Sequence, residues 1–463
     1  MSEQPLSRQE LYEQVRKVGK EEFILEEMIR YGFWSPQATI PEDPADEIRR
    51  ELQELPRESS RLHNEQKLRK EALKQRLAES RRKQQETKER RERERLKRAE
   101  AWKQRKQQEI IYLGEEVSAG LNHHQGNLER LRNNNLPLCN TAEEIADSMG
   151  INIGKLRFLA FNRKTSTVSH YIRFKMSKKT GGERIISAPM PNLKQAQYWI
   201  LTNILNKLNV HEAAHGFCQQ RSIITNAIPH VDKDVVINFD LKDFFPSISY
   251  KRVKGLFHSF GYSETAATIF ALLCTSADIE KLQLDARTYY VAVGDRYLPQ
   301  GSPASPAISN LLCRRLDKRL TGMAEKLNFT YTRYAHDLTF SGSGESLRYI
   351  CNILRRTESI VTHEGLRINQ DKTRILRNTR QQEVTGIVVN EKLSVCRKTL
   401  RKFRATLFQI ETEGLAGKKW GNSNNLIAAI TGYANFVAMV NPEKGKKFQK
   451  QIKRIKIKYL GNR

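Results

Sequence analysis

Residues 61 to 110 constrain the architecture of this chain more than any other stretch. They contain no proline or glycine and consist mainly of residues that favour helix. This composition predicts one continuous helix, which we place within residues 59–118. About fifty residues rising ~1.5 Å each give a length of roughly 75 Å, which exceeds the diameter of a small domain. We therefore expect the helix to project from the rest of the chain or to lie along a partner.

The charge of this predicted helix is strongly positive. Residues 61 to 110 hold 19 Lys and Arg side chains against 9 Asp and Glu, a formal charge of +10. Its leucines and Trp102 are too sparse for the apolar seam of a coiled coil. Two interpretations stay open. The helix is either a solvated, charged rod or a basic rod that contacts the phosphates of RNA or DNA.

The whole chain is also basic, with 80 Lys and Arg against 52 Asp and Glu and a formal net charge of +28. Such a surplus attracts polyanions, and nucleic acid is the first candidate. No stretch approaches the roughly 18 consecutive apolar residues that a membrane span requires, and MSEQPLSRQE lacks the features of a secretory signal. We therefore expect a cytoplasmic protein with no membrane partner. The scattered cysteines predict reduced thiols.

Composition divides the chain into four predicted regions. An N-terminal helical segment occupies residues 1–58 and precedes the long basic helix at 59–118. Short β-rich runs then alternate with helical segments over 119–393, which indicates an α+β domain. Two basic amphipathic helices are predicted within 394–463. Within the α+β region, Thr141 and Glu144 have the spacing of a capping box at a helix start.

Two acidic positions lie at the ends of predicted strands. The run VVINFDLKDFFPSI, residues 235–248, delivers Asp240 at the end of a strand, and YTRYAHDLTF, residues 331–340, carries Asp337. Neighbouring strands would bring these two carboxylates together. Paired carboxylates favour hard divalent cations, and phosphoryl transfer uses two such ions about 3.5–4 Å apart. The sequence therefore predicts metal-dependent chemistry on a nucleic acid.

Several segments resemble reverse transcriptases and occur in the order found in that family. They are YIRFKMSKKTGGERIISAP (171–189), HGF (215–217), FDLKDFFPSI (239–248), LPQGSPASPAISN (298–310), YAHD (334–337) and LRINQDKTRI (366–375). NAIPH (226–230) and VTG (384–386) resemble the motifs that mark retron reverse transcriptases. The charged N-terminal extension is similar to that of the myxobacterial type. The resemblance implies a right-hand polymerase fold with fingers and palm in 119–393 and a thumb in 394–463.

The resemblance also implies roles for individual residues. Asp240 would bind two Mg²⁺ ions, Lys372 would donate a proton to departing pyrophosphate, and Phe245 would exclude a ribose 2′-hydroxyl. Other residues would hold the triphosphate or line the nucleotide pocket: Lys178, Lys179, Arg184, Asp243, Gln300 and Gly301. The residues expected in RNA recognition are Asn226, His230, Val384, Thr385 and Gly386. For His230, a structural role and a catalytic role are the alternatives.

The YAHD turn departs from the family pattern, Tyr-Ala-Asp-Asp, because His336 stands at the first Asp. The expected metal group is therefore Asp240, His336 and Asp337. Imidazole suits borderline transition metals better than Mg²⁺, so its presence should cost several kcal/mol of transition-state stabilisation. Three interpretations stay open. The chain polymerises poorly or not at all, it keeps activity because Asp337 shifts or Mn²⁺ is accepted, or the sequence contains an error.

The resemblance finally implies a biological task. A retron enzyme uses dNTPs to copy a structured non-coding RNA, starts from a guanosine 2′-hydroxyl, and yields branched RNA-linked single-stranded DNA (msDNA). Retrons act in antiphage defence with a separate effector protein. Two alternatives are a catalytically weak or silent RNA-binding scaffold and a group II intron-like or diversity-generating reverse transcriptase.

Overall fold

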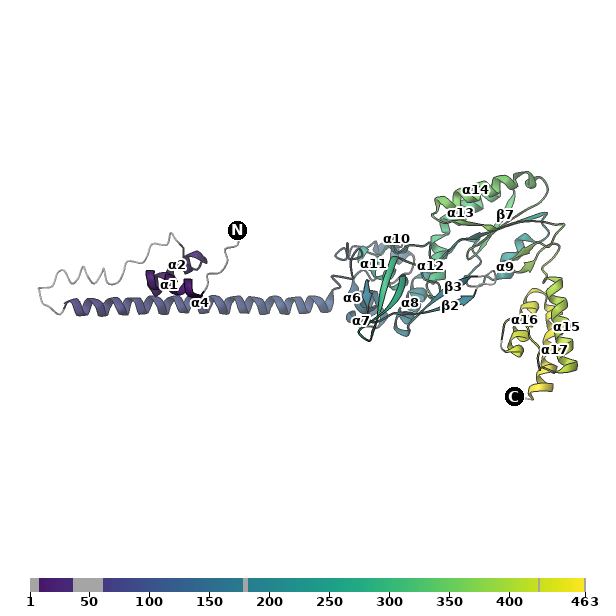
Figure 1. Ribbon diagram of the computed structural model, residues 1–463. Coiled ribbons are helices and arrows are strands. Elements are labelled where there is room, and N and C mark those ends of the chain that lie inside the picture. Colours follow the sequence, from purple (N-terminus) through teal and green to yellow (C-terminus); the bar gives the residue numbers. More distant parts are fainter. Residues whose placement is uncertain (1–7, 36–60, 178–181, 424, 462–463) are drawn as a thin grey trace. The chain divides into compact units, whose positions relative to one another are not determined.

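The computed structural model describes residues 8–35, 61–177, 182–423 and 425–461 (Figure 1). The chain divides into two compact units, Met1–Trp102 and Lys103–Arg463, which we describe separately. Among the described residues, no helix combines the length and the apolar character needed to cross a membrane.

The first unit is helical. It contains α1 (Arg8–Val18), α2 (Lys20–Arg30) and most of α4 (Arg61–Gln108), and Ser80 of α4 donates a hydrogen bond to the sulfur of Met28 at 3.9 Å. The long basic helix predicted from the sequence is thus confirmed. It ends at Gln108, before the predicted limit of 118, because the following segment buries Ile110 and Leu113 in the core of the second unit.

A four-stranded antiparallel sheet lies at the centre of the second unit, in the order β7 (Phe329–Tyr334), β8 (Asp337–Gly342), β4 (Val235–Leu241), β9 (Ile368–Arg377). Successive side chains of a strand point to opposite faces. One face of β4 therefore packs Val235, Ile237 and Phe239 into a core shared with α13 (Arg314–Lys326) and α14 (Ile350–His363). The opposite face carries Asn238 and Asp240. Alternation alone thus directs Asp240 away from the helices.

A second hydrophobic core joins several helices of the same unit. These helices are α5 (Leu128–Asn133), α6 (Ala142–Met149), α7 (Ile153–Ala160), α8 (Pro191–Asn203), α10 (Tyr250–Ser259), α11 (Glu264–Cys274) and α12 (Ser305–Leu312). The predicted capping box is confirmed, since Thr141 Oγ1 accepts from the Glu144 amide at 3.2 Å and Glu144 Oε2 accepts from the Thr141 amide at 3.1 Å.

Two smaller sheets flank this helical core. The strands β2 (Tyr171–Ser177) and β3 (Glu183–Pro189) form a hairpin, and β1 (Thr165–Ser166), β6 (Arg287–Tyr297) and β5 (Ser276–Leu284) form a three-stranded sheet. Short helical segments complete the region: η1 (Leu205–Lys207), α9 (Ile223–Ala227), η2 (Ile228–His230) and η3 (Gly344–Tyr349). Antiparallel sheets with segregated helices confirm the predicted α+β class.

Three helices close the chain, α15 (Arg397–Glu413), α16 (Leu426–Val440) and α17 (Pro442–Leu460). They share a core with the two-stranded ladder of β10 (Glu383–Val384) and β11 (Ile387–Val388). The crossing of α16 and α17 requires glycine at 445, because a Cβ atom there would lie 2.0 Å from the Cα of Ala438. Two helices were predicted in this region, and the second, placed over residues 432–456, is divided in the structure into the apolar α16 and the basic α17.

Candidate active site

Asp240 and Asp337 occupy directly paired positions on β4 and β8, at the end of the central sheet. The turn between β7 and β8 contains Ala335 and His336, and the amide of Leu241 donates to the carbonyl of His336 at 2.9 Å. A register shift between Asn238 and Asp240 in the pairing of β4 with β9 sets Asp240 opposite Asn369. Backbone pairing therefore brings residues almost a hundred positions apart to one place.

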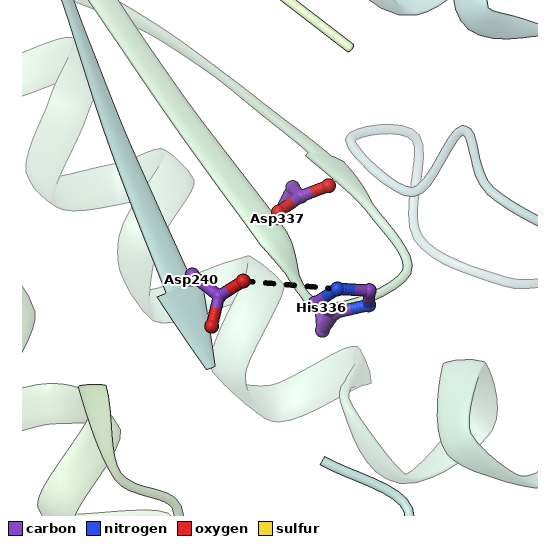
Figure 2. A group of neighbouring side chains, drawn as sticks. All are labelled: Asp240, His336 and Asp337. Carbon is purple, nitrogen blue, oxygen red and sulfur yellow. Dashed lines mark ion pairs between the residues drawn. The ribbon is translucent and has the colours of Figure 1, made fainter. Parts of the chain in front are cut away.

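The side chains of Asp240, His336 and Asp337 converge there (Figure 2). One ligand atom from each lies within 4.8 Å of the others. The Nε2 atom of His336 is 3.8 Å from Asp240 Oδ1, and the side chains of Asp240 and His336 are 14% and 39% exposed. The group is thus reachable from solvent but is partly enclosed by the protein.

Two residues of β9 contact the same carboxylate. Lys372 Nζ donates to Asp240 Oδ1 at 3.0 Å, and Asn369 Nδ2 donates to Asp240 Oδ2 at 3.4 Å. Of these, Lys372 was predicted as a site residue and Asn369 was not, although it lies in the quoted segment LRINQDKTRI. Both oxygens of Asp240 therefore have a hydrogen-bond donor from β9.

The electrostatics of the group favour a bound cation. Burial raises the pKa of Asp337 above its ordinary value, the carboxylate of Asp240 raises it further, and His336 and Lys372 act in the opposite direction. Two carboxylates this close repel each other unless a positive charge lies between them. A divalent ion would provide that charge.

The donor set fits one divalent ion. The ligands of an octahedral Mg²⁺ at about 2.1 Å lie roughly 3–4 Å apart, so small side-chain adjustments would bring all three donor atoms within range. Two carboxylates and one imidazole also suit Mn²⁺. A second ion fits less well, because His336 offers one nitrogen where a carboxylate could bridge two ions.

Aromatic rings border the group. Phe245 lies 5.4 Å from Phe244 and 6.5 Å from Phe217, measured between ring centroids, and Phe244 lies 6.5 Å from the ring of His336. Phe217, which is 54% exposed, also lies 6.5 Å from Tyr334. The sequence arguments did not assign Phe217 a role, although the HGF segment contained it.

The remaining predicted substrate-binding residues are arranged around the β2–β3 hairpin and the strand end. The carbonyl of Gln300 accepts from the amide of Ser187 on β3 at 2.8 Å. Gly301 has φ +120°, and a Cβ there would lie 2.7 Å from the Ser187 carbonyl oxygen. Arg184 is exposed on β3, and Asp243 is exposed beyond β4 with φ 47°. Lys178 and Lys179 lie outside the described residues.

The two motifs expected in RNA recognition contact each other. Asn226 is fully buried, and its Nδ2 donates to Thr385 Oγ1 at 3.4 Å. Thr385 and Gly386 have φ of 47° and 86°, forming the tight turn between β10 and β11, while Val384 is buried in the core with α15–α17. Only the turn itself is therefore placed to meet a ligand.

His230 does not occupy a position suited to RNA contact. It is fully buried, with Nδ1 2.7 Å from Ser341 Oγ and Nε2 2.7 Å from Thr332 Oγ1. Both ring nitrogens are thus already used within the core, so direct contact of this residue with RNA stays untested. The structural alternative for His230 agrees with this position.

A sheet that joins carboxylates from separate strands at one end, backed by two helices, is the palm of a right-hand polymerase fold. A sequence profile described as reverse transcriptase (RNA-dependent DNA polymerase) matches residues 176–400. The protein is therefore an RNA-directed DNA polymerase by class.

Curated relatives narrow this class. The retron Mx162 reverse transcriptase of Myxococcus xanthus is 42% identical over 338 residues, covering 70% of this chain and 69% of that protein. The retron Ec86 reverse transcriptase of Escherichia coli is 32% identical over 73% of this chain and 96% of that protein. The chain belongs to the retron reverse transcriptases, and its similarity to the Myxococcus protein confirms the myxobacterial type.

Among solved structures, telomerase from Candida albicans in complex with a fragment of telomeric RNA aligns with 60% of this chain and 56% of that chain. Its TM-score is 0.36 and its identity 13%, a likeness too distant to bear on the activity.

Proposed function

We propose that this protein copies part of a structured non-coding RNA into DNA that stays linked to the RNA through a guanosine 2′-oxygen, giving msDNA. The observation that carries the proposal is the pairing of Asp240 with Asp337 at one end of the central sheet, in a chain whose relatives are retron reverse transcriptases. Its substrates are dNTPs. It works in the cytoplasm beside a separate effector protein, as part of an antiphage system.

The proposed catalytic group is Asp240, His336 and Asp337, with Lys372 beside it. The three residues would hold Mg²⁺ or Mn²⁺, and the bound ion would supply stabilisation of the charge that develops on the transferring phosphate. Lys372 keeps a proton at Nζ, 3.0 Å from Asp240 Oδ1, where it could be passed to departing pyrophosphate. The Asp240 carboxylate orients that ammonium group.

Selection and binding of the nucleotide fall to residues around this group. Phe245 blocks the space that a ribose 2′-hydroxyl would need, and its ring is supported by Phe244 and Phe217. Gln300 and Gly301 line the nucleotide pocket, where the absent side chain of Gly301 permits close backbone approach. The cationic and acidic groups near the triphosphate are Lys178, Lys179, Arg184 and Asp243.

Recognition of the RNA is assigned to the turn at Thr385 and Gly386, which Asn226 supports through its contact with Thr385. A β-branched residue with φ 47° is unfavourable in isolation, so this turn needs such support. The basic helices α15, α17 and α4 attract the RNA or DNA backbone through their charge.

A second candidate function follows from His336. Loss of one carboxylate from the metal group weakens Mg²⁺ binding, so the natural chain could serve as an RNA-binding scaffold that synthesises little DNA. The rest of the site still has the geometry of a polymerase, including the close approach of Gly301 to β3 and the rings beside Phe245. This argues that the chain has not been inactive for long.

Primer extension on an RNA template tests the proposal and separates the two functions. The natural chain and a His336→Asp variant are compared in Mg²⁺ and in Mn²⁺, with Asp240→Asn as the inactive control. We expect weak synthesis by the natural chain that Mn²⁺ increases, and a gain of about 100-fold for His336→Asp in Mg²⁺, equivalent to roughly 2.7 kcal/mol. Synthesis by the variant alone supports the scaffold. No synthesis by either protein in either metal contradicts the polymerase.

Sequencing the nucleic acid that copurifies with the chain tests the RNA partner. A single structured RNA bearing covalently linked DNA is expected for a retron enzyme that is active. RNA without attached DNA supports the scaffold, and group II intron RNA would contradict the retron assignment.

A further inference from the structure

Arg333 lies at the end of β7, three residues before His336, and its side chain is completely buried. Its guanidinium forms four hydrogen bonds. Nε and Nη2 donate to the two carboxylate oxygens of Asp317 at 2.8 and 2.7 Å. Nη1 donates to Asn310 Oδ1 at 2.9 Å and to the carbonyl of Ala335, within the YAHD turn, at 3.0 Å. One side chain thus connects α12, α13 and the turn.

A second connection reaches the turn through Asn310. The Nδ2 of this residue donates to the carbonyl of Gly216 at 2.8 Å. Gly216 packs directly on the turn, since a Cβ there would lie 2.5 Å from the amide nitrogen of Ala335. The backbone of Arg333 also pairs with this segment, because its amide donates to Ala213 and its carbonyl accepts from His215, both at 2.7 Å. The turn is therefore contacted at both the carbonyl and the amide of Ala335.

Ala335 needs such support. Its φ of 57° lies in the left-handed region, which residues other than glycine adopt only when their surroundings impose it. The conformation of Ala335 sets the direction in which the next two residues, His336 and Asp337, leave the turn. Any relaxation at Ala335 would move both side chains relative to Asp240.

Stability alone does not explain this buried ion pair. Removing Arg333 and Asp317 from water costs free energy, and buried ion pairs can often be replaced by apolar residues without loss of stability. The planar guanidinium has the geometry to bind a carboxylate with two N–H groups while its remaining N–H groups reach Asn310 and Ala335. Lysine at this position could not make this set of contacts.

We propose that Arg333, together with Asp317 and Asn310, is a positioning residue that fixes the YAHD turn and so aims His336 and Asp337 at Asp240. These three residues act through the turn and lie outside the metal group itself. The inference rests on the metal group described under the proposed function. It adds to that group a buried support that reaches the site only through the backbone.

Binding of Mn²⁺ to the full chain, followed by electron paramagnetic resonance, tests this without relying on DNA synthesis. Variants Arg333→Lys and Asn310→Ala are compared with the natural chain. Residues that orient metal ligands typically change affinity by 10 to 100-fold, so we expect at least a tenfold rise in the Mn²⁺ dissociation constant for both variants. Asn310→Ala leaves the Arg333–Asp317 pair intact, which keeps the test usable if Arg333→Lys does not fold.

Tyr331→Phe is the matched control. Its hydroxyl donates to Asp317 Oδ1 at 2.9 Å, so the variant removes a buried hydrogen bond from the same carboxylate without touching the turn. Its Mn²⁺ affinity should equal that of the natural chain, while thermal unfolding reports any general loss of stability. Equal affinities in all four proteins, or an equal loss in Tyr331→Phe, would overturn the positioning role. Absence of Mn²⁺ binding by the natural chain would instead overturn the metal group on which it rests.

Discussion

Lys372 Nζ donates a hydrogen bond to Asp240 Oδ1 at 3.0 Å, and the same oxygen lies 3.8 Å from Nε2 of His336. One carboxylate oxygen therefore faces the ammonium group of β9 and the imidazole of the turn. A divalent cation that takes this oxygen as a ligand must compete with the ammonium group, which links metal binding to the position of Lys372.

Replacing Lys372 by methionine should move metal affinity and DNA synthesis in opposite directions. A partly exposed ion pair contributes about 0.2–1 kcal/mol, so Lys372→Met should bind Mn²⁺ up to about fivefold more tightly. Loss of the proton donor should at the same time lower the rate of nucleotide addition. Lys242→Met, which removes an exposed lysine just after β4, is the control. Unchanged affinity would show that Lys372 does not compete with the ion.

Phe245→Ala should weaken the preference for dNTPs over NTPs. The effect is best measured in the His336→Asp background, where synthesis in Mg²⁺ is expected to be robust. A pocket rejects one additional small group by roughly 10 to 200-fold. The kcat/KM for a dNTP divided by the kcat/KM for the matching NTP should therefore fall by a factor in that range. Phe158→Ala, which removes a 43% exposed ring on α7, should leave the ratio unchanged. If the dNTP preference is unchanged in Phe245→Ala, another residue excludes the 2′-hydroxyl.

The buried position of His230 predicts a pH dependence of stability. Burial lowers the pKa of His230 from 6.5 to about 3, so the folded protein keeps this imidazole neutral under conditions in which the unfolded chain takes up a proton. Above about pH 6.5 both states are neutral and the residue has no effect. Below that value folding loses about 1.4 kcal/mol for each pH unit, down to about pH 3.

His230→Phe removes this titration. The variant loses the hydrogen bonds to Ser341 and Thr332 at every pH, so it should be less stable than the natural chain at neutral pH. The difference in unfolding free energy should shrink by about 1.4 kcal/mol for each unit as the pH falls from about 6 to about 4. Chemical denaturation at several pH values gives this difference. If the unfolding free energies of the two proteins change with pH in parallel, the imidazole titrates normally in the folded state.

Local patterns predicted local features well. Helix-forming composition without proline or glycine predicted α4, and the Thr141–Glu144 spacing predicted the capping box of α6. The run of β-branched residues before Asp240 predicted β4. The side to which Asp240 points then follows from the alternation of side chains along any strand. The end of α4 was misplaced, since that boundary depends on Ile110 and Leu113 reaching a distant core.

Long-range contacts were less accessible from sequence. The HGF and NAIPH segments were recognised as motifs, but their sequences did not indicate that Phe217 lies beside Phe245. They also did not indicate that His230 is enclosed between Thr332 and Ser341. Arg333 was assigned no role from the sequence. Its burial against Asp317 follows from the packing of α13 on the sheet, which no local pattern encodes.

The sequence by itself determined the chemical inventory: a basic chain, acidic residues at strand ends, an imidazole where the family has a carboxylate, and the identity of that family. Tertiary structure decided which of these groups meet. Antiparallel pairing sets Asp240 against Asp337, the register shift beside Asn369 brings β9 under the same carboxylate, and burial withdraws His230 from any ligand. These outcomes depend on contacts between segments far apart along the chain, whose free energies belong to the packed fold and to no single segment.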